Sequence, residues 1–267
     1  MRPISSNGQT QTVSSPLSRD PGLYGRSFAE IYDEWYRDAF DTPAAVTALH
    51  QLAGSGPVLE LGVGTGRLAI PLAATGLRVV GIDASQEMLD QLHRHADGDS
   101  IVSVCGDMAC VAQELSRAEI SDSFTLAFCA FNTLLNLSDE DSVLQCFAQT
   151  RSILASDGRL VIEAFVPVES DSVPLRSLTP AQVRSEAAVF IETRFSPTTL
   201  ILEGQHVEVR AGSVSKRPWS VILFGPDRID DAAQQAGFTL VDRWSDWNGA
   251  DFTDASTSHI SIYAPTA

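Results

Sequence analysis

Short apolar runs alternate with amphipathic stretches over the first two thirds of the chain. The runs predict buried strands, and the stretches between them repeat apolar positions at helical spacing. We expect strands at 58–61, 78–83, 100–104, 124–130 and 160–165, and helices at 67–74, 85–95, 111–115 and 139–154. Strands that alternate with helices are typical of a parallel sheet covered on both faces. The pattern therefore predicts an α/β fold with a Rossmann-like sheet.

The pattern changes after residue 168, where a Ser- and Pro-rich connection reaches to about residue 178. Period-two segments at 188–195, 199–210 and 218–224 then predict antiparallel strands. A helix at 226–236 and a hairpin-like pair of strands at 238–244 and 259–263 follow. We interpret residues 169–224 as an antiparallel β insertion after the fifth strand.

Two helices are expected before the first strand, at 27–40 with an aromatic face and at 43–52. Residues 1–22 are rich in Ser, Thr, Gln and Pro and hold no apolar secretory segment. We predict a disordered leader over 1–22 and one domain over 23–267 that includes the insertion.

Composition narrows the class of partner. A formal charge of −16 repels phosphate backbones, and the compact basic pair Lys216-Arg217 is too small for a nucleic-acid groove. No run approaches the roughly 18 apolar residues of a membrane span. The cysteines lack paired spacing and have apolar neighbours, so we expect reduced core residues of a cytoplasmic protein, with no disulfide or metal. They are Cys105, Cys110, Cys129 and Cys146. A small-molecule substrate is favoured.

A glycine-rich loop follows the first strand and carries the first chemical signal. Gly62, Gly64 and Gly66 let backbone amides approach a ligand at the start of a helix. The nicotinamide-binding fingerprint uses glycines for the same purpose, but with another spacing. Asp83, about 20 residues further on, can accept hydrogen bonds from ribose hydroxyls in either case. It indicates an adenosine ribose without choosing the cofactor.

The end of the third strand supplies a further acid. The Asp107 carboxylate can accept from an exocyclic amine while Met108 packs on an adenine plane. In this order and spacing, the segments ELGVGTGR (60–67), GIDASQEML (81–89) and GDM (106–108) resemble class I S-adenosylmethionine-dependent methyltransferases. The resemblance covers residues 28–165 closely. It implies a seven-stranded sheet whose last strands are antiparallel, which fits residues 238–263.

The resemblance also implies the cofactor, S-adenosyl-L-methionine, and its contacts. The helix YDEWY (32–36) is similar to the Y-D-x-x-Y helix of small-molecule N- and O-methyltransferases, including amino-sugar N-methyltransferases, whose tyrosines close over the cofactor. For the tyrosines of this helix, the alternative is an aromatic face packed on the core. For Arg67, which follows the glycine loop, the alternative is an exposed helical residue. The implied cofactor-binding residues are Tyr32, Tyr36, Glu60, Gly62, Gly64, Arg67, Asp83, Ala84, Met88, Gly106, Asp107 and Met108.

Candidates for catalysis are Tyr32, Asn132, Glu163 and His206. Asn132, in the loop after the fourth strand, can orient a nucleophile but is no useful base, and it can equally cap the loop. Glu163 ends the fifth strand at the ligand-binding edge, where it can accept a proton or hold an amine. His206 is either a general base or a surface strand histidine.

Candidates for substrate binding are Tyr36, Asn132, Glu163, Trp219, Trp247 and Phe252. Trp247 and Phe252 belong to a segment similar to the W-x-G-x-x-F/Y segment of the same enzymes, so they wall the pocket or pack in the core. Lys216, Arg217 and Trp219 either clamp an anionic group or mark a solvated turn.

The resemblance thus predicts methyl transfer to an N or O atom of a small, natural-product-like acceptor, with the insertion serving as a lid or as the surface of a homodimer. One alternative is a protein of the same fold that binds the cofactor but catalyses another reaction, such as cyclisation. A nicotinamide oxidoreductase is the other.

Overall fold

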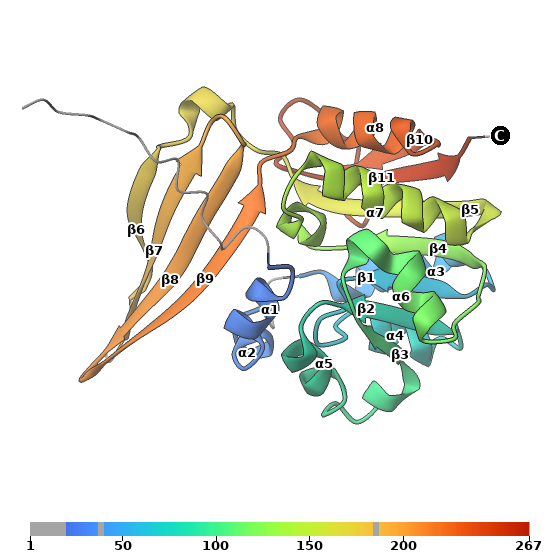
Figure 1. Ribbon diagram of the computed structural model, residues 1–267, viewed down its shortest axis with the longest axis horizontal. Coiled ribbons are helices and arrows are strands. Elements are labelled where there is room, and N and C mark those ends of the chain that lie inside the picture. The colour runs from blue at the N-terminus through green and yellow to red at the C-terminus, as the bar shows by residue number, and fades with distance from the viewer. Residues whose placement is uncertain (1–19, 37–39, 184–186, 267) are drawn as a thin grey trace, which may run out of the picture.

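The molecule is built around a seven-stranded sheet with a separate four-stranded sheet beside it (Figure 1). The computed structural model describes residues 20–36, 40–183 and 187–266. The strands are β1 (Val58–Leu61), β2 (Val79–Asp83), β3 (Val102–Cys105), β4 (Phe124–Cys129), β5 (Leu154–Phe165), β6 (Arg176–Val183), β7 (Ala187–Ser196), β8 (Ile201–Arg210), β9 (Ser213–Ile222), β10 (Phe238–Trp244) and β11 (Ser258–Pro265). The helices are α1 (Leu23–Phe28), α2 (Tyr32–Tyr36), α3 (Thr42–Ala53), α4 (Ala69–Ala74), α5 (Gln86–Leu92), α6 (Val111–Arg117), α7 (Glu140–Ile153) and α8 (Pro226–Gln235). Short 3-10 helices are η2 (Gly98–Ser100), η3 (Met108–Cys110), η4 (Thr133–Asn136) and η5 (Ser170–Ser172).

The large sheet has the order β10-β11-β5-β4-β1-β2-β3. The strands β1 to β5 pair in parallel with their neighbours in this order, whereas β11 pairs antiparallel with both β5 and β10. This confirms the predicted Rossmann-like sheet and its antiparallel ending. Because the parallel strands share one direction, the loops that follow β1 to β5 all emerge at the same edge of the sheet.

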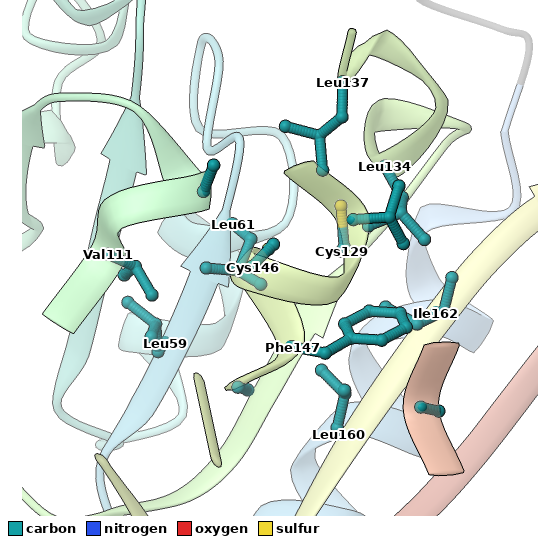
Figure 2. Close-up of a cluster of buried hydrophobic side chains, with 14 of the residues drawn as sticks. Leu59, Leu61, Val111, Cys129, Leu134, Leu137, Cys146, Phe147, Leu160 and Ile162 are labelled. Carbon is teal, nitrogen blue, oxygen red and sulfur yellow. The ribbon is translucent and has the colours of Figure 1, made fainter. Parts of the chain in front are cut away.

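Helices cover both faces of this sheet and bury a core on each. On one face, α6, α7 and α8 pack against alternate strand residues such as Leu59, Leu61 and Ile162 (Figure 2). On the other, α3, α4 and α5 cover residues such as Val58 and Val161. The side chains of β1 are buried on both faces, as expected of a central parallel strand. No helix among the described residues has the length and apolar character needed to cross a bilayer.

The insertion is an antiparallel sheet in the order β6-β7-β8-β9. It stands apart from the large sheet, and α1 and α2 lie between the two (Figure 1). Three of its strands agree with the prediction, whereas β6, which begins where the Ser- and Pro-rich connection was expected to end, was not predicted as a strand. Pro180 and the bulge that follows it sit on an edge strand, where a missing N–H costs no ladder hydrogen bond.

The N-terminal region differs from the prediction as well. The single helix expected at 27–40 is two helices, α1 and α2, with a turn at 29–31, and residues 37–39 lie outside the described part. Phe28 at the end of α1 is fully buried, and Tyr32 and Trp35 of α2 pack against it while staying partly exposed. Residues 1–19 of the predicted leader also lie outside the described part.

Two smaller expectations need correction. Cys129 and Cys146 are buried free thiols, but Cys105 is exposed because it ends the edge strand β3. Lys216 and Arg217 lie within strand β9, so no turn carries them, and the Arg217 guanidinium is 3.2 Å from the Glu208 carboxylate.

Candidate active site

A cavity of about 320 Å3 opens at the carboxyl edge of the large sheet. It is bounded by that edge, by α1 and α2, and by the facing strands β8 and β9. Its lining residues include Tyr24, Gly25, Tyr32, Tyr36, Gly62, Gly64, Asp83, Met88, Gly106, Met108, Phe131, Asn132, Thr133, Phe165, Leu202, His206, Trp219 and Val221. The glycine loop, the second-strand acid and the insertion thus meet in one place.

The glycine loop has the backbone that only glycine adopts freely. Gly62, Gly64 and Gly66 have φ values of 76°, 56° and 87°. A Cβ on Gly62 would lie 2.2 Å from the Cγ2 atom of Thr133, so the loop after β4 closes directly on this glycine. Gly64, in contrast, has nothing within 4 Å of its missing Cβ, so a bound ligand can reach the loop backbone there without meeting a side chain.

Asp83 is fixed by backbone donors from two loops. Its Oδ2 accepts from the Gly64 N–H and its Oδ1 from the Ser85 N–H, both at 2.9 Å. Burial raises the pKa of this carboxyl above its usual range, against the lowering effect of the two backbone donors. The side chain borders the cavity and keeps lone pairs for a further donor. Ala84 follows it but is not among the lining residues.

The acid after β3 is placed less directly. Gly106 and Met108 border the cavity, whereas Asp107 caps η3 and accepts from the Ala109 N–H at 2.9 Å. The cap uses only the Oδ1 atom of Asp107, so its Oδ2 atom takes no part in the cap.

Glu60 lies beneath the glycine loop, only 4% exposed. Burial raises its pKa to about 8, with nearby Arg67 acting in the opposite direction. Within the described residues its Oε2 is buried without a hydrogen-bond partner. Since buried polar atoms are nearly always paired, this oxygen suits a donor from a bound molecule.

Tyrosines form the roof of the cavity. The rings of Tyr32 and Tyr36 lie 4.9 Å apart, and the Tyr24 hydroxyl donates to the Tyr36 hydroxyl at 3.4 Å. Burial raises the pKa of Tyr24 and of Tyr32, so both hydroxyls stay protonated. Asp33 fixes α2 by accepting from the Thr65 hydroxyl at 2.7 Å, and it also contacts His95 Nε2 at 3.0 Å.

Tyr32 and Tyr36 also border a second cavity, of about 380 Å3, on the other side of the glycine loop. Arg67 lines this second cavity, with its guanidinium 4.0 Å from the centre of the Phe40 ring. Arg67 is thus placed beside the tyrosines and within electrostatic reach of Glu60, and not on the main cavity.

The loop after β4 is held by Glu163 in a strained conformation. Phe131 and Asn132 have φ values of 49° and 63°, in the left-handed region. The Phe131 N–H donates to Glu163 Oε2 at 2.8 Å, and the Trp247 Nε1–H donates to Glu163 Oε1 at 2.9 Å. Asn132 Oδ1 accepts from the Phe165 N–H at 2.6 Å. Glu163 therefore acts on the cavity through the loop, because it does not line the cavity itself.

His206 faces the cavity from the insertion, together with Trp219. Its Nδ1 accepts from the Trp219 Nε1–H at 3.1 Å, and its ring meets Phe28 and Trp35 edge-on at centroid distances of 5.3 and 5.4 Å. Burial, followed by the charge of Arg217, lowers its pKa. His206 is thus a partly buried neutral histidine and not a surface strand histidine.

Trp247 and Phe252 take other positions. Trp247 bonds Glu163 from behind the loop, and Phe252 packs against buried His259 with a ring-centroid distance of 6.3 Å. Neither lines the cavity, where Phe131, Leu202 and Val221 supply the apolar wall instead. The sequence analysis missed these three residues and Tyr24, since an isolated apolar residue carries no signal of a pocket.

Comparison with known proteins identifies the family. The chain matches a methyltransferase domain model over residues 58–158. The CcbJ methyltransferase of Streptomyces caelestis has a similar structure, with a TM-score of 0.83 and 31% identity over 93% of this chain and 100% of that one. An S-adenosylmethionine-bound amino pentose methyltransferase of Micromonospora echinaspora, CalS10, shares the fold with a TM-score of 0.62 and 18% identity, over 88% of this chain and 97% of its own.

Among curated sequences, a putative methyltransferase of Geobacillus sp. (strain WCH70) is 28% identical over 120 residues, which are 45% of this chain and 47% of that protein. The chain spans about half or less of the length of the curated relatives it matches. The likeness to the Streptomyces enzyme extends over nearly the whole chain, and the glycine loop, Asp83 and the antiparallel sheet ending agree with it. The chain therefore belongs to the class I S-adenosylmethionine-dependent methyltransferases.

Proposed function

We propose that this enzyme transfers the methyl group of S-adenosylmethionine to an amine nitrogen of a small, natural-product-like molecule. The observation that carries the choice of nitrogen is that both candidate bases are already engaged. Both oxygens of Glu163 accept hydrogen bonds, and His206 Nδ1 accepts from Trp219. A hydroxyl or phenol gains most from a base, whereas a neutral amine attacks with its own lone pair.

The described residues fit the cofactor. The unpartnered Glu60 Oε2 suits its ammonium group, and the open surface at Gly64 suits the close approach of its methionine part. We assign the ribose hydroxyls to Asp83. The adenine belongs with Met108 and the free oxygen of Asp107, and the carboxylate with Arg67 beside the tyrosines.

When bound, the cofactor would supply a methyl group attached to a positively charged sulfur, and the leaving group would be the neutral thioether. The acceptor nitrogen forms the new N–C bond as the S–C bond breaks, and the resulting ammonium loses its proton to water. The protein aligns the reactants and excludes solvent, which can supply much of the acceleration of a displacement reaction. The Tyr24, Tyr32 and Tyr36 roof excludes water, and Asn132, held through its Oδ1, leaves its amide N–H groups to orient the acceptor.

The β6–β9 sheet forms the acceptor side of the site in this proposal. Leu202 and Val221 give that wall its apolar surface, and His206 and Trp219 its polar atoms. The formal charge of −16 also favours approach of a cationic amine over an anionic acceptor. CalS10, which shares the fold alone with this chain, is an amino pentose methyltransferase, and a small, amine-bearing substrate in that protein supports the proposal.

The proposal is tested with purified enzyme, deuterated-methyl cofactor and a set of small secondary amines, each paired with the alcohol of the same skeleton. We expect the label on nitrogen in amine products and no turnover of the alcohols, read by mass spectrometry with fragmentation. Label on oxygen or carbon would refute the choice of nitrogen.

A further inference from the structure

Trp219 and His206 form a polar pair on the inner face of the insertion. In the antiparallel register, Trp219 lies opposite Gly204 on β8, and a Cβ on Gly204 would come within 2.3 Å of the indole Cζ2 atom. The indole ring therefore packs directly on the Gly204 backbone, in space that the Cβ of any other residue would occupy. In that position its Nε1–H donates to His206 Nδ1 at 3.1 Å.

The pair decides which histidine nitrogen carries the proton. An imidazole nitrogen that accepts a hydrogen bond has no proton, so the neutral His206 ring carries its proton on Nε2. The ring stays neutral because burial and the positive charge of Arg217, its cross-strand neighbour, both lower its pKa. Glu208, two residues further along the same strand, pairs with Arg210 and Arg217, and no acid of the described residues pairs with His206.

The remaining polar atom of the ring, Nε2, belongs to a side chain that borders the cavity. His206 is among the lining residues, and its Nε2 is not one of the buried, partnerless atoms of the described residues. Phe28 and Trp35 hold the ring edge-on and so fix its direction. What the insertion presents to the acceptor is thus an oriented N–H donor framed by the apolar side chains of Leu202 and Val221.

We propose that His206 recognises a carbonyl or ether oxygen on the methyl acceptor through its Nε2–H, and that Trp219, seated on Gly204, is the positioning residue that fixes this donor. This inference rests on the proposed function, since it names the acceptor as an amine that also carries a hydrogen-bond-accepting oxygen. His206 then binds the substrate and takes no proton from it.

Nitrogen-15 NMR of histidine-labelled enzyme, saturated with S-adenosylhomocysteine at pH 7.5, tests the donor directly. We expect the His206 ring to be neutral with its proton on Nε2. In Trp219→Phe, which keeps an aromatic ring but loses the donor, we expect both tautomers, whereas Ser220→Ala, the neighbour on the opposite face of β9, should leave the wild-type signals. A charged ring, or a proton on Nδ1 in the wild type, would overturn the inference.

Recognition is tested with secondary amines in matched pairs, in which an amide carbonyl or ether oxygen of one member is replaced by methylene in the other. We expect the oxygen-bearing member to have a KM about five- to tenfold lower, the size of one neutral hydrogen bond. His206→Phe should abolish this preference, and His206→Gln, which retains an N–H donor, should restore part of it. Equal KM values for both members in the wild type would overturn the recognition role even if every amine is methylated. Failure to methylate any amine would instead refute the proposed function.

Discussion

Substitution of Gly62 by Ala tests how closely the glycine loop and the loop after β4 are packed. Two costs are expected. A left-handed φ of 76° costs an alanine about 1–2 kcal/mol of folding stability. The new Cβ would also lie 2.2 Å from Thr133 Cγ2, and overpacking of this kind costs about 1–3 kcal/mol. We expect Gly62→Ala to lower the free energy of unfolding by roughly 2–5 kcal/mol.

The chain provides a matched control in Gly64, which has a φ of 56° but nothing within 4 Å of its missing Cβ. Gly64→Ala should therefore show the conformational cost alone, about 1–2 kcal/mol. Thr133→Ser removes the clashing Cγ2 atom, and the next contacts, to Thr133 Cβ at 3.3 Å and Oγ1 at 3.6 Å, are far milder. In the Gly62→Ala, Thr133→Ser double variant most of the overpacking cost should disappear.

The wild type, the three single variants and the double variant are compared by chemical denaturation, and the double-mutant cycle isolates the Gly62–Thr133 contact. Equal losses of stability in Gly62→Ala and Gly64→Ala, or no recovery in the double variant, would show that the two loops are not packed as described. Calorimetry with S-adenosylhomocysteine on the same variants then reports whether the contact also shapes the cofactor site.

Three further predictions concern acids and a histidine. Asp83→Asn loses the carboxylate that accepts from two backbone N–H groups and faces the cavity, so calorimetry should show S-adenosylhomocysteine binding about 10- to 100-fold weaker; unchanged affinity would refute its role. Glu163→Gln sets an amide NH2 against the N–H of Phe131 or of Trp247, and thermal unfolding should report a loss of about 1–3 kcal/mol, an unchanged midpoint being the contrary result. Burial lowers the pKa of His259 to about 4 from 6.5. Unfolding then takes up a proton between these pH values, so stability is full above pH 6.5 and falls towards pH 4. Chemical denaturation at several pH values should show that the free energy of unfolding declines less steeply between pH 6.5 and 4 in His259→Gln than in the wild type. The same decline in both proteins would contradict this role of His259.

The β–α alternation allowed most of the large sheet to be predicted because each element repeats its own local period. Ser85 illustrates this local signal, since it begins the helix predicted at 85–95 and its hydroxyl oxygen caps α5 by accepting from the Met88 N–H. The failures have physical causes as well. Strand β6 carries a proline and was not predicted as a strand. The break between α1 and α2 falls in a turn at 29–31, although Phe28 and Trp35 on its two sides pack together, and helical periodicity alone does not reveal such a break.

The cofactor half of the site was easier to predict than the acceptor half. Gly62 and Asp83 follow strand ends that parallel topology brings together, so their sequence order already implies proximity. His206 and Trp219 meet only through the register of β8 and β9, 13 residues apart in the chain, and the partners of Glu163 come from two separate loops. The engagement of both candidate bases was therefore invisible in the sequence.

The central claim is that the enzyme transfers methyl to an amine without a base of its own. The most direct measurement is the pH dependence of kcat/KM with two amine acceptors of the same shape but different pKa, such as an amine and its fluorinated analogue. Without an enzymatic base, the rising limb of the profile follows the amine and shifts by the difference in acceptor pKa. A rising limb at the same pH for both acceptors, abolished by His206→Gln or Glu163→Gln, would contradict the account.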